Sequence, residues 1–256
     1  MDKVREAQAA GLPSYGVWVT IGDPLSGEAL GRAGYDCAVL DAQHGGITFD
    51  NLITMIQALD LSGTRALVRP PANDPGQIMR ALDLGALGVV VPMVSTEAQA
   101  RMAAEATRYP PNGVRSFGLV RNYYGVAPIA FEPLCFVMIE TAEALGNLDA
   151  IAAVPGVDGL FVGPVDLAIS LGLGPSLEMG PEVMDAMDRV VAACGRHGKI
   201  PGSASLGLTN ARALIDRGVR FIAQGNDLGF IRRSAAAEVE QLRAWRAELG
   251  GAASAG

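Results

Sequence analysis

Two acidic residues follow short apolar runs and could bind a metal ion. Glu140 comes directly after Phe136–Ile139, and Asp166 comes shortly after Gly159–Val162. Carboxylate oxygens with no cysteine or histidine nearby suit a hard divalent cation such as Mg²⁺ or Mn²⁺, and two ligands leave positions for water or a chelating substrate. The pair therefore predicts a divalent-cation site.

His44 is the candidate general base. It is one of two histidines and lies in a glycine-flanked segment after an apolar run that ends in Asp41. An imidazole exchanges a proton near neutral pH, which suits it to acid–base catalysis. Asp41 and Asp83 are both candidates to orient it. The other histidine, His197, is expected at a helix end, where it favours the helix dipole.

The lysines exclude one mechanism. The chain has only Lys3 and Lys199, and neither stands at the end of an apolar run. No amine is therefore expected at the site to form a Schiff base, which excludes class I aldolase chemistry. A reaction through an enolate would instead need the metal and Arg69, which ends the run Ala66–Arg69, to hold the negative charge.

These residues follow strands in a repeating pattern. Eight apolar runs alternate with amphipathic stretches, which is typical of βα units around a parallel sheet. The predicted strands are Tyr15–Thr20, Asp36–Asp41, Ala66–Arg69, Gly88–Pro92, Leu134–Glu140, Asp158–Val162, Lys199–Ser203 and Arg220–Ala223. The predicted helices are Phe49–Leu59, Pro75–Leu84, Thr96–Thr107, Ala142–Ala153, Pro181–Arg196, Thr209–Arg217 and Ile231–Leu249. The pattern predicts an α/β fold, a TIM-type (β/α)₈ barrel, with an open flavodoxin-like sheet as the alternative.

The length of 256 residues fits one barrel domain over residues 1–249. The small residues of 250–256 predict a disordered tail. Arg108–Glu132 is rich in proline and glycine, and a loop of this length in a compact domain is usually functional.

The composition limits the partners and the compartment. Half of the residues are hydrophobic, 18% are charged and the net charge is −7, so no basic stripe is available for nucleic acid or anionic lipid. No apolar run approaches the ~20 residues that span a bilayer, and the charged N-terminus does not resemble a signal peptide. Cys37, Cys135 and Cys194 are expected to be buried free thiols, so we expect a cytoplasmic protein without a membrane partner.

A set of motifs runs in order along nearly the whole chain. They are Leu40-Asp41-Ala42-Gln43-His44, Val68-Arg69-Pro70 with Asn73-Asp74-Pro75, Val91-Pro92-Met93-Val94, Arg108–Arg115, Ile139-Glu140-Thr141 and Gly156–Leu167. Together they resemble the HpcH/HpaI aldolase family, and within it the class II pyruvate aldolases.

The resemblance implies a barrel of the phosphoenolpyruvate/pyruvate-domain type, assembled as a hexamer (a trimer of dimers) that exchanges C-terminal helices. It implies a divalent metal, Mg²⁺, Mn²⁺ or Co²⁺, held by Glu140 and Asp166. It further implies that His44 is the base, that Asp83 raises its basicity and that Arg69 stabilises the transition state. The segment Gly163, Pro164, Val165 and Asp166 matches the pocket for the pyruvate carboxylate.

Three positions bear on the substrate. Met138 stands where well-known members carry a glutamine, which removes a hydrogen bond to the keto acid. Gln43 stands where many members have a glutamate, which makes this region one charge less negative. Ser116, in the segment Arg115–Gly118, resembles a position that meets the acceptor aldehyde.

The function we predict is reversible aldol cleavage of a 4-hydroxy-2-oxoacid into pyruvate, or a related 2-oxoacid, and an aldehyde. One alternative is an acyl-CoA lyase like the citrate-lyase β relatives, which would need a basic patch that the sequence does not show. Another is a non-catalytic barrel that binds an anion at the Gly202–Gly207 loop.

Overall fold

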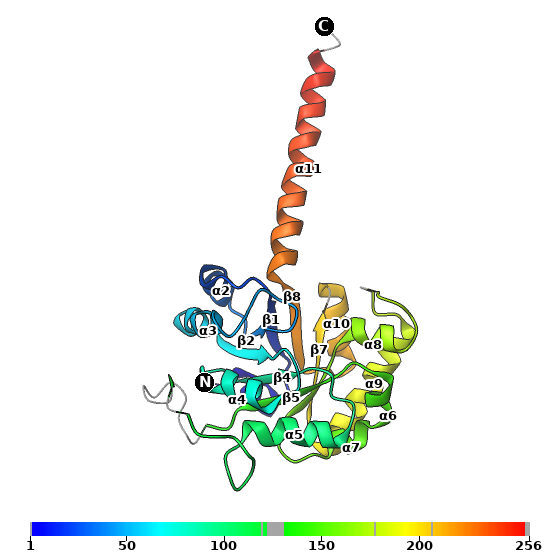
Figure 1. Ribbon diagram of the computed structural model, residues 1–256. Coiled ribbons are helices and arrows are strands. Elements are labelled where there is room, and N and C mark those ends of the chain that lie inside the picture. The colour runs from blue at the N-terminus through cyan, green and yellow to red at the C-terminus, as the bar shows by residue number, and fades with distance from the viewer. Residues whose placement is uncertain (1, 119, 122–130, 177, 206, 254–256) are drawn as a thin grey trace.

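Eight parallel strands close into a barrel in chain order, β1 to β8 (Figure 1). The computed structural model describes residues 2–118, 120–121, 131–176, 178–205 and 207–253, with side chains to 249. The strands are β1 (Ser14–Val19), β2 (Cys37–Asp41), β3 (Arg65–Arg69), β4 (Gly88–Val91), β5 (Leu134–Ile139), β6 (Gly159–Val162), β7 (Ile200–Ser205) and β8 (Phe221–Asn226). The β1–β8 pairing closes the circle, so the predicted barrel is confirmed and the open sheet is wrong.

The helices lie outside the strands. They are α1 (Lys3–Ala9), α2 (Pro24–Gly31), α3 (Leu52–Leu61), α4 (Pro75–Asp83), α5 (Glu97–Thr107), α6 (Ala142–Gly146), α7 (Leu148–Ala152), α8 (Pro164–Ser170), α9 (Pro181–His197), α10 (Leu208–Asp216) and α11 (Asp227–Ala253). All seven predicted helices are present, although the stretch Ala142–Ala153 forms two short helices, α6 and α7. The prediction missed α1, α2 and α8, of which α2 begins with an aspartate cap and a proline, as α4 does.

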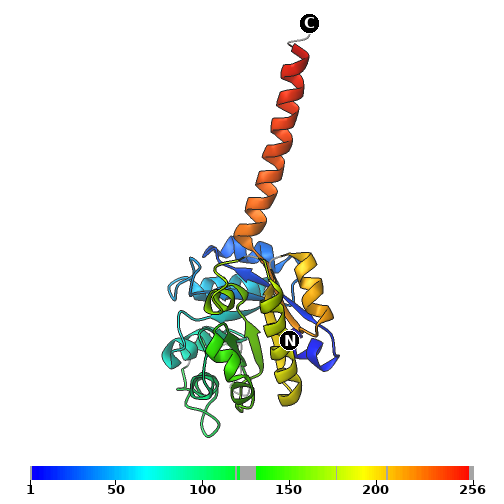
Figure 2. The same ribbon diagram turned by 90° about the vertical axis from the view of Figure 1, so that its right-hand side faces the viewer.

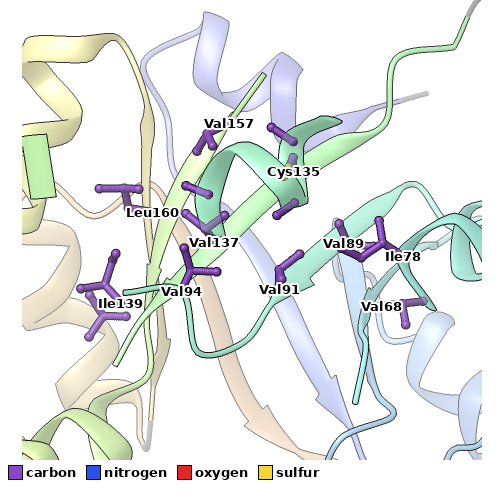
Figure 3. Close-up of a cluster of buried hydrophobic side chains, with 14 of the residues drawn as sticks. Val68, Ile78, Val89, Val91, Val94, Cys135, Val137, Ile139, Val157 and Leu160 are labelled. Atoms are coloured by element: carbon purple, nitrogen blue, oxygen red, sulfur yellow. The ribbon is translucent and has the colours of Figure 1, made fainter. Parts of the chain in front are cut away.

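Successive side chains along each strand alternate between two apolar cores. Side chains that face outward from the strands pack against the helices, and Figure 3 shows part of this outer core, where Val89 lies beside Ile78 of α4. Side chains that face inward fill the barrel, with rings of Phe136, Phe161 and Phe221 in contact at its centre. This period of two decides which residues can reach the barrel interior.

The N-terminal ends of the strands form a closed, structural end of the barrel. Val4 of α1 is buried in the inner core. Lys199 lies just before β7, and its Nζ donates hydrogen bonds to the carbonyls of Val154 (3.3 Å) and Val157 (2.8 Å). The predicted position of this lysine, away from the C-terminal ends of the strands, is confirmed.

The last helix, α11, does not pack along the barrel. It leaves the C-terminal end of β8 and projects outward (Figures 1 and 2). It carries exposed apolar side chains, among them Ile231, Leu242 and Trp245. The helix is assigned as far as Ala253, and residues 254–256 of the expected tail lie outside the described residues. Within the described residues, no helix is long and apolar enough to cross a membrane.

Candidate active site

The alternation along the strands brings charged residues to the C-terminal end of the barrel interior. In β2, Cys37 and Val39 face inward, and Asp41 is the next residue of that phase. The same period places Arg69 after Leu67 in β3, and it places Glu140 after Met138 at the end of β5. Because the strands are parallel, these side chains share one end of the barrel, where barrel enzymes carry their active sites.

Asp41 and Arg69 form a buried ion pair. They are register partners in the β2–β3 pairing. Arg69 donates from Nε to Asp41 Oδ1 (2.9 Å) and from Nη2 to Oδ2 (2.6 Å), in the forked geometry that suits arginine and carboxylate. Trp18 completes the cluster, because its Nε1 donates to Asp41 Oδ2 (3.1 Å) and its ring lies 4.8 Å from the guanidinium carbon.

The environment of Asp41 favours its charged form. The carboxylate is 2% exposed, and burial alone would raise its pKa. The hydrogen bonds and positive charge of Arg69, together with donations from the His44 amide and Trp18, outweigh burial and lower the pKa. Asp41 also accepts the backbone N–H of Gln43, so it fixes the turn that carries His44.

Glu140 is buried without such compensation. Its side chain follows β5 and is 3% exposed. Oε1 accepts one hydrogen bond, from the backbone N–H of Met93 (2.6 Å), and Oε2 has no hydrogen bond within the described part of the chain. Burial raises the pKa of Glu140 and outweighs the opposing hydrogen bond from the Met93 amide. The negative charge of Asp166 also raises this pKa, and the positive charge of Arg69 opposes it.

The donor set of this acidic pair fits a divalent cation. A buried carboxylate beside a second negative charge needs a proton or a cation to offset its desolvation. Glu140 supplies an oxygen without a hydrogen bond, and the more exposed Asp166 in the first turn of α8 supplies a second carboxylate. Among the described residues, no three histidine, cysteine or acidic side chains are grouped so that they alone could hold a metal ion, so water and substrate would complete the coordination.

A cavity of about 170 Å³ opens beside these residues. Arg69 and Asp166 line it, together with the predicted binding residues Met138, Gly163, Pro164 and Val165, and with Trp18, Phe161, Ala204, Ser205, Ala223, Gly225 and Asn226. A larger hollow around Arg108 and Tyr109 lies toward the N-terminal ends of the strands and includes none of the predicted site residues. The smaller cavity is therefore the candidate active site.

His44 lies in the loop after β2, at the same end of the barrel as Asp41. Its side chain is exposed. No hydrogen bond among the described residues joins its ring to Asp41 or Asp83. Asp41 instead accepts from the His44 backbone N–H (3.1 Å), so it orients the loop and not the imidazole.

Asp83 and Ser116 are not brought to this site within one chain. Asp83 ends α4, and a helix that returns from a strand tip ends beside the opposite ends of the strands. There it accepts a hydrogen bond from Arg115 Nη2 (2.8 Å), and Arg115 also lies over the ring of Tyr109. Ser116, next to Arg115, is exposed. The roles implied for both residues are therefore not accounted for by a single subunit.

Sequence reasoning missed several residues around the cavity. Trp18 gave a usable signal, since it shares the inward phase of Gly16 in β1 and the indole N–H of a half-buried tryptophan usually has a hydrogen-bond partner. The lining residues of β7 and β8, Ser205 and Asn226 among them, are small or uncharged and gave no comparable signal.

Comparison with known proteins gives the family. Residues 14–234 match the family described as HpcH/HpaI aldolase/citrate lyase. The chain is 38% identical over 254 residues to a hydroxypyruvate/pyruvate aldolase of Rhizorhabdus wittichii, covering 95% of this chain and all of the relative. It is 39% identical over 239 residues to a 5-keto-4-deoxy-D-glucarate aldolase of Klebsiella pneumoniae, covering 90% of this chain and 93% of that protein.

A solved structure agrees with these relatives. The crystal structure of an HpcH/HpaI aldolase/citrate lyase family protein from Burkholderia cenocepacia is similar, with a TM-score of 0.86 and 30% identity, covering 95% of this chain and all of that one. The aldolase resemblance is thus confirmed, and the non-catalytic alternative is not supported. The chain belongs to the HpcH/HpaI aldolase/citrate lyase family and is an enzyme, a lyase.

Proposed function

We propose that the protein is a metal-dependent class II aldolase that reversibly cleaves 4-hydroxy-2-oxoacids into pyruvate, or a related 2-oxoacid, and an aldehyde. The observation that carries this proposal is a buried carboxylate, Glu140, that is exposed to the negative charge of Asp166 and has no cationic side chain hydrogen-bonded to it among the described residues. The ion-paired Arg69 lies in the same cavity. The named relatives, a hydroxypyruvate/pyruvate aldolase and a 5-keto-4-deoxy-D-glucarate aldolase, support the same class of reaction.

Glu140 and Asp166 would hold the cation, Mg²⁺, Mn²⁺ or Co²⁺. When bound, such an ion polarises a keto carbonyl and acidifies the carbon next to it. The first-turn amides of Val165 and Asp166 lack partners inside α8 and line the cavity, so they can bind the carboxylate of a 2-oxoacid. The modest cavity volume suits a small acid of this kind.

Arg69 would stabilise the charge that develops on the keto oxygen. Its Nε and Nη2 are bound to Asp41, and its Nη1 has no hydrogen bond among the described residues. The pairing with Asp41 and the ring of Trp18 hold the guanidinium in place before substrate binds. A preorganised donor of this kind costs little reorganisation at the moment of reaction.

His44 would move the proton on the aldehyde oxygen, directly or through a water. Its exposure leaves the ring accessible to substrate, and Asp41 fixes the backbone that carries it. If it is the base, a His44→Ala variant should lose the limb of the pH–rate profile that reports its titration. An unchanged profile would remove His44 from the scheme.

Met138 leaves the apolar wall of the cavity without a hydrogen-bond donor. It is 2% exposed and lines the cavity below Glu140. A glutamine in its place could donate to a bound keto acid, whereas a thioether cannot. We propose that the 2-oxoacid is therefore held mainly by the ion, Arg69 and the amides at α8, and that Met138 contributes apolar contact.

We propose that the protein works as a hexamer, a trimer of dimers that exchanges α11. The apolar side chains of α11 are exposed in the single chain, and burial in a neighbouring copy would remove them from water. Asp83 and Ser116 would then serve the site of a neighbouring copy, since they lie at the wrong end of their own barrel. The buried free thiols of the described chain fit a reducing compartment, and we propose the cytoplasm.

The function is tested by turnover with pyruvate and a panel of aldehydes, with and without chelator, across Mg²⁺, Mn²⁺ and Co²⁺. We expect aldol addition that is abolished by chelation and restored by at least one of the ions. Full turnover after removal of bound metal would contradict the metal-dependent mechanism. Cleavage of malyl-CoA in place of 4-hydroxy-2-oxoacids would favour the acyl-CoA lyase alternative.

The shared site is tested by mixing two inactive variants, His44→Ala and Asp83→Ala, and letting the subunits exchange. If Asp83 acts on a neighbouring copy, some sites in the mixed oligomer regain both native residues, and part of the activity returns. Mixing that restores no activity, while subunit exchange is shown by native mass spectrometry, would show that Asp83 does not act on the site of a neighbouring copy.

A further inference from the structure

Met93 has an unusual backbone conformation beside the proposed metal site. It follows β4 and Pro92, and its φ of +56° makes it the one non-glycine residue with positive φ among those the structure describes. An unbranched side chain such as methionine adopts this left-handed region seldom, and residues held there tend to cluster at functional sites. The conformation therefore calls for a compensating interaction.

That interaction is the hydrogen bond to Glu140. The Met93 N–H donates to Glu140 Oε1 at 2.6 Å, and it is the one hydrogen bond that the carboxylate accepts within the described residues. The Met93 side chain is 52% exposed and makes no hydrogen bond there. The backbone of Met93, and not its thioether, is thus the part that contacts the site.

A second feature restrains the other oxygen of the same carboxylate. A Cβ at Gly163 would lie 2.6 Å from Glu140 Oε2 and 3.1 Å from the end of Met138. The first distance is too short for a real contact and the second is tight, and both neighbours are buried, so an added methyl group would push the carboxylate aside. The absence of a side chain at Gly163 leaves the space that Oε2 occupies.

We propose that the Met93 amide and the bare backbone of Gly163 are positioning devices that fix Glu140 for the cation, the amide by holding Oε1 and the glycine by leaving room for Oε2. This inference rests on the proposed function, because it assigns the purpose of the restraint to metal binding. Neither residue needs to touch the ion. Partners that orient a metal ligand typically change metal affinity by 10–100-fold when they are lost.

The test is the Kd of Mn²⁺, measured by calorimetry on the purified metal-free protein without substrate. Met93→Pro removes the N–H and sets φ near −65°, so we expect Mn²⁺ to bind about 10–100-fold more weakly. Met93→Gly keeps the N–H and accepts a positive φ, so it should rescue most of the affinity that proline loses. Equal Mn²⁺ affinity of the proline variant and the wild type would overturn the proposal for Met93, and so would equal losses in both variants.

Gly163→Ala tests the second half independently, and it serves if Met93→Pro does not fold. We expect its Mn²⁺ affinity to fall by at least about tenfold. Gly146→Ala is the matched control, because a Cβ at Gly146 meets no atom within 4 Å, and its affinity should equal that of the wild type. Wild-type affinity in Gly163→Ala would overturn the role of Gly163.

The proposed metal-dependent function and the positioning role of Met93 and Gly163 fail in different ways. If the wild-type protein itself binds no divalent ion, the proposed metal-dependent function fails. If the wild type binds Mn²⁺ and all three variants at Met93 and Gly163 bind it equally well, only the positioning role fails. Measuring kcat and KM separately at saturating Mn²⁺ adds a further check. The metal site of Gly163→Ala should then be occupied again, so part of its lost activity should return.

Discussion

Two buried carboxylates at the same end of the barrel have opposite electrostatic environments. Asp41, at the end of β2, accepts hydrogen bonds from Arg69, Trp18 and two backbone amides, and its pKa is lowered. Glu140, just after β5, accepts one from Met93, and its pKa is raised. The two are similarly buried, at 2% and 3% exposed, so burial does not account for the difference.

The charge of Asp41 is compensated within the protein, whereas that of Glu140 is not. The protein neutralises Asp41 with its own residues, so this carboxylate serves to hold Arg69 and the turn before His44. The negative charge of Asp166 makes the ionised form of Glu140 less favourable, so Glu140 is suited to a ligand that brings positive charge. Two acidic residues in equivalent places can thus have different roles, and the surrounding donors decide which.

The largest expected effect comes from breaking the ion pair between Asp41 and Arg69. Arg69→Ala leaves Asp41 buried without its cation, so we expect unfolding free energy to fall by about 3–5 kcal/mol. Because Arg69 is also the proposed charge stabiliser, kcat should fall on the order of 10²–10³-fold. Urea melts and steady-state kinetics measure both, and Arg80→Ala, on the exposed side of α4, is the control. Ordinary retro-aldol activity in Arg69→Ala would contradict its role.

Removing the uncompensated charge of Glu140 should not lower the stability of the metal-free protein, in contrast to the loss of Arg69. Glu140→Gln takes away a buried negative charge, so we expect the metal-free variant to be at least as stable as the wild type. At free Mn²⁺ of 100 times Kd the wild type should gain about 2.7 kcal/mol, and the variant should gain little. Thermal melts in chelator and in Mn²⁺ measure this, with Glu143→Gln on the exposed face of α6 as the control. An equal Mn²⁺ gain in the Glu140 variant would remove Glu140 from the metal site.

A smaller effect is expected from removing one hydrogen bond to Asp41. Trp18→Phe removes the indole N–H that donates to Asp41 and keeps an aromatic ring beside Arg69. A hydrogen bond to a charged group of this kind contributes about 1.5 kcal/mol, so the variant should lose stability by that amount. Chemical denaturation measures the loss. A variant as stable as the wild type would show that Arg69 and the backbone amides suffice for Asp41.

The smallest expected effects are in the pH dependence of stability, measured in chelator. The raised pKa of Glu140 means that its contribution is present below the ordinary value of 4.5 and is lost as pH rises through the folded value. Relative to Glu140→Gln, the wild type should therefore lose stability as pH rises above about 4.5.

The lowered pKa of Asp41 gives the reverse sign. Its contribution is present above the ordinary value of 3.8 and is lost as pH falls through the folded value. Relative to Asp41→Asn, the wild type should therefore lose stability as pH falls below 3.8. Parallel curves for the wild type and both variants would show that the two carboxyls do not differ as described.

Much of the site could be predicted because strand ends are visible in the sequence. Apolar runs that end in Asp41, Arg69 and Glu140 mark the C-terminal ends of parallel strands, and the fold brings those ends together. The position of Asp83 was available too, since the last turn of a predicted helix lies beside the opposite ends of the strands. The resemblance to a family implies a role for Asp83 but does not say in which subunit it would act.

The sequence by itself determined the eight strands, their order and the lack of a lysine at the site. These follow from local periodicity and from the fixed handedness of βα connections. Only the tertiary structure decided that Asp41 pairs with Arg69 and Trp18, and that a left-handed Met93 donates to Glu140. Those contacts depend on the register between strands and on the tilt that closes the barrel, which bring together residues far apart in the chain and leave no periodic trace in it.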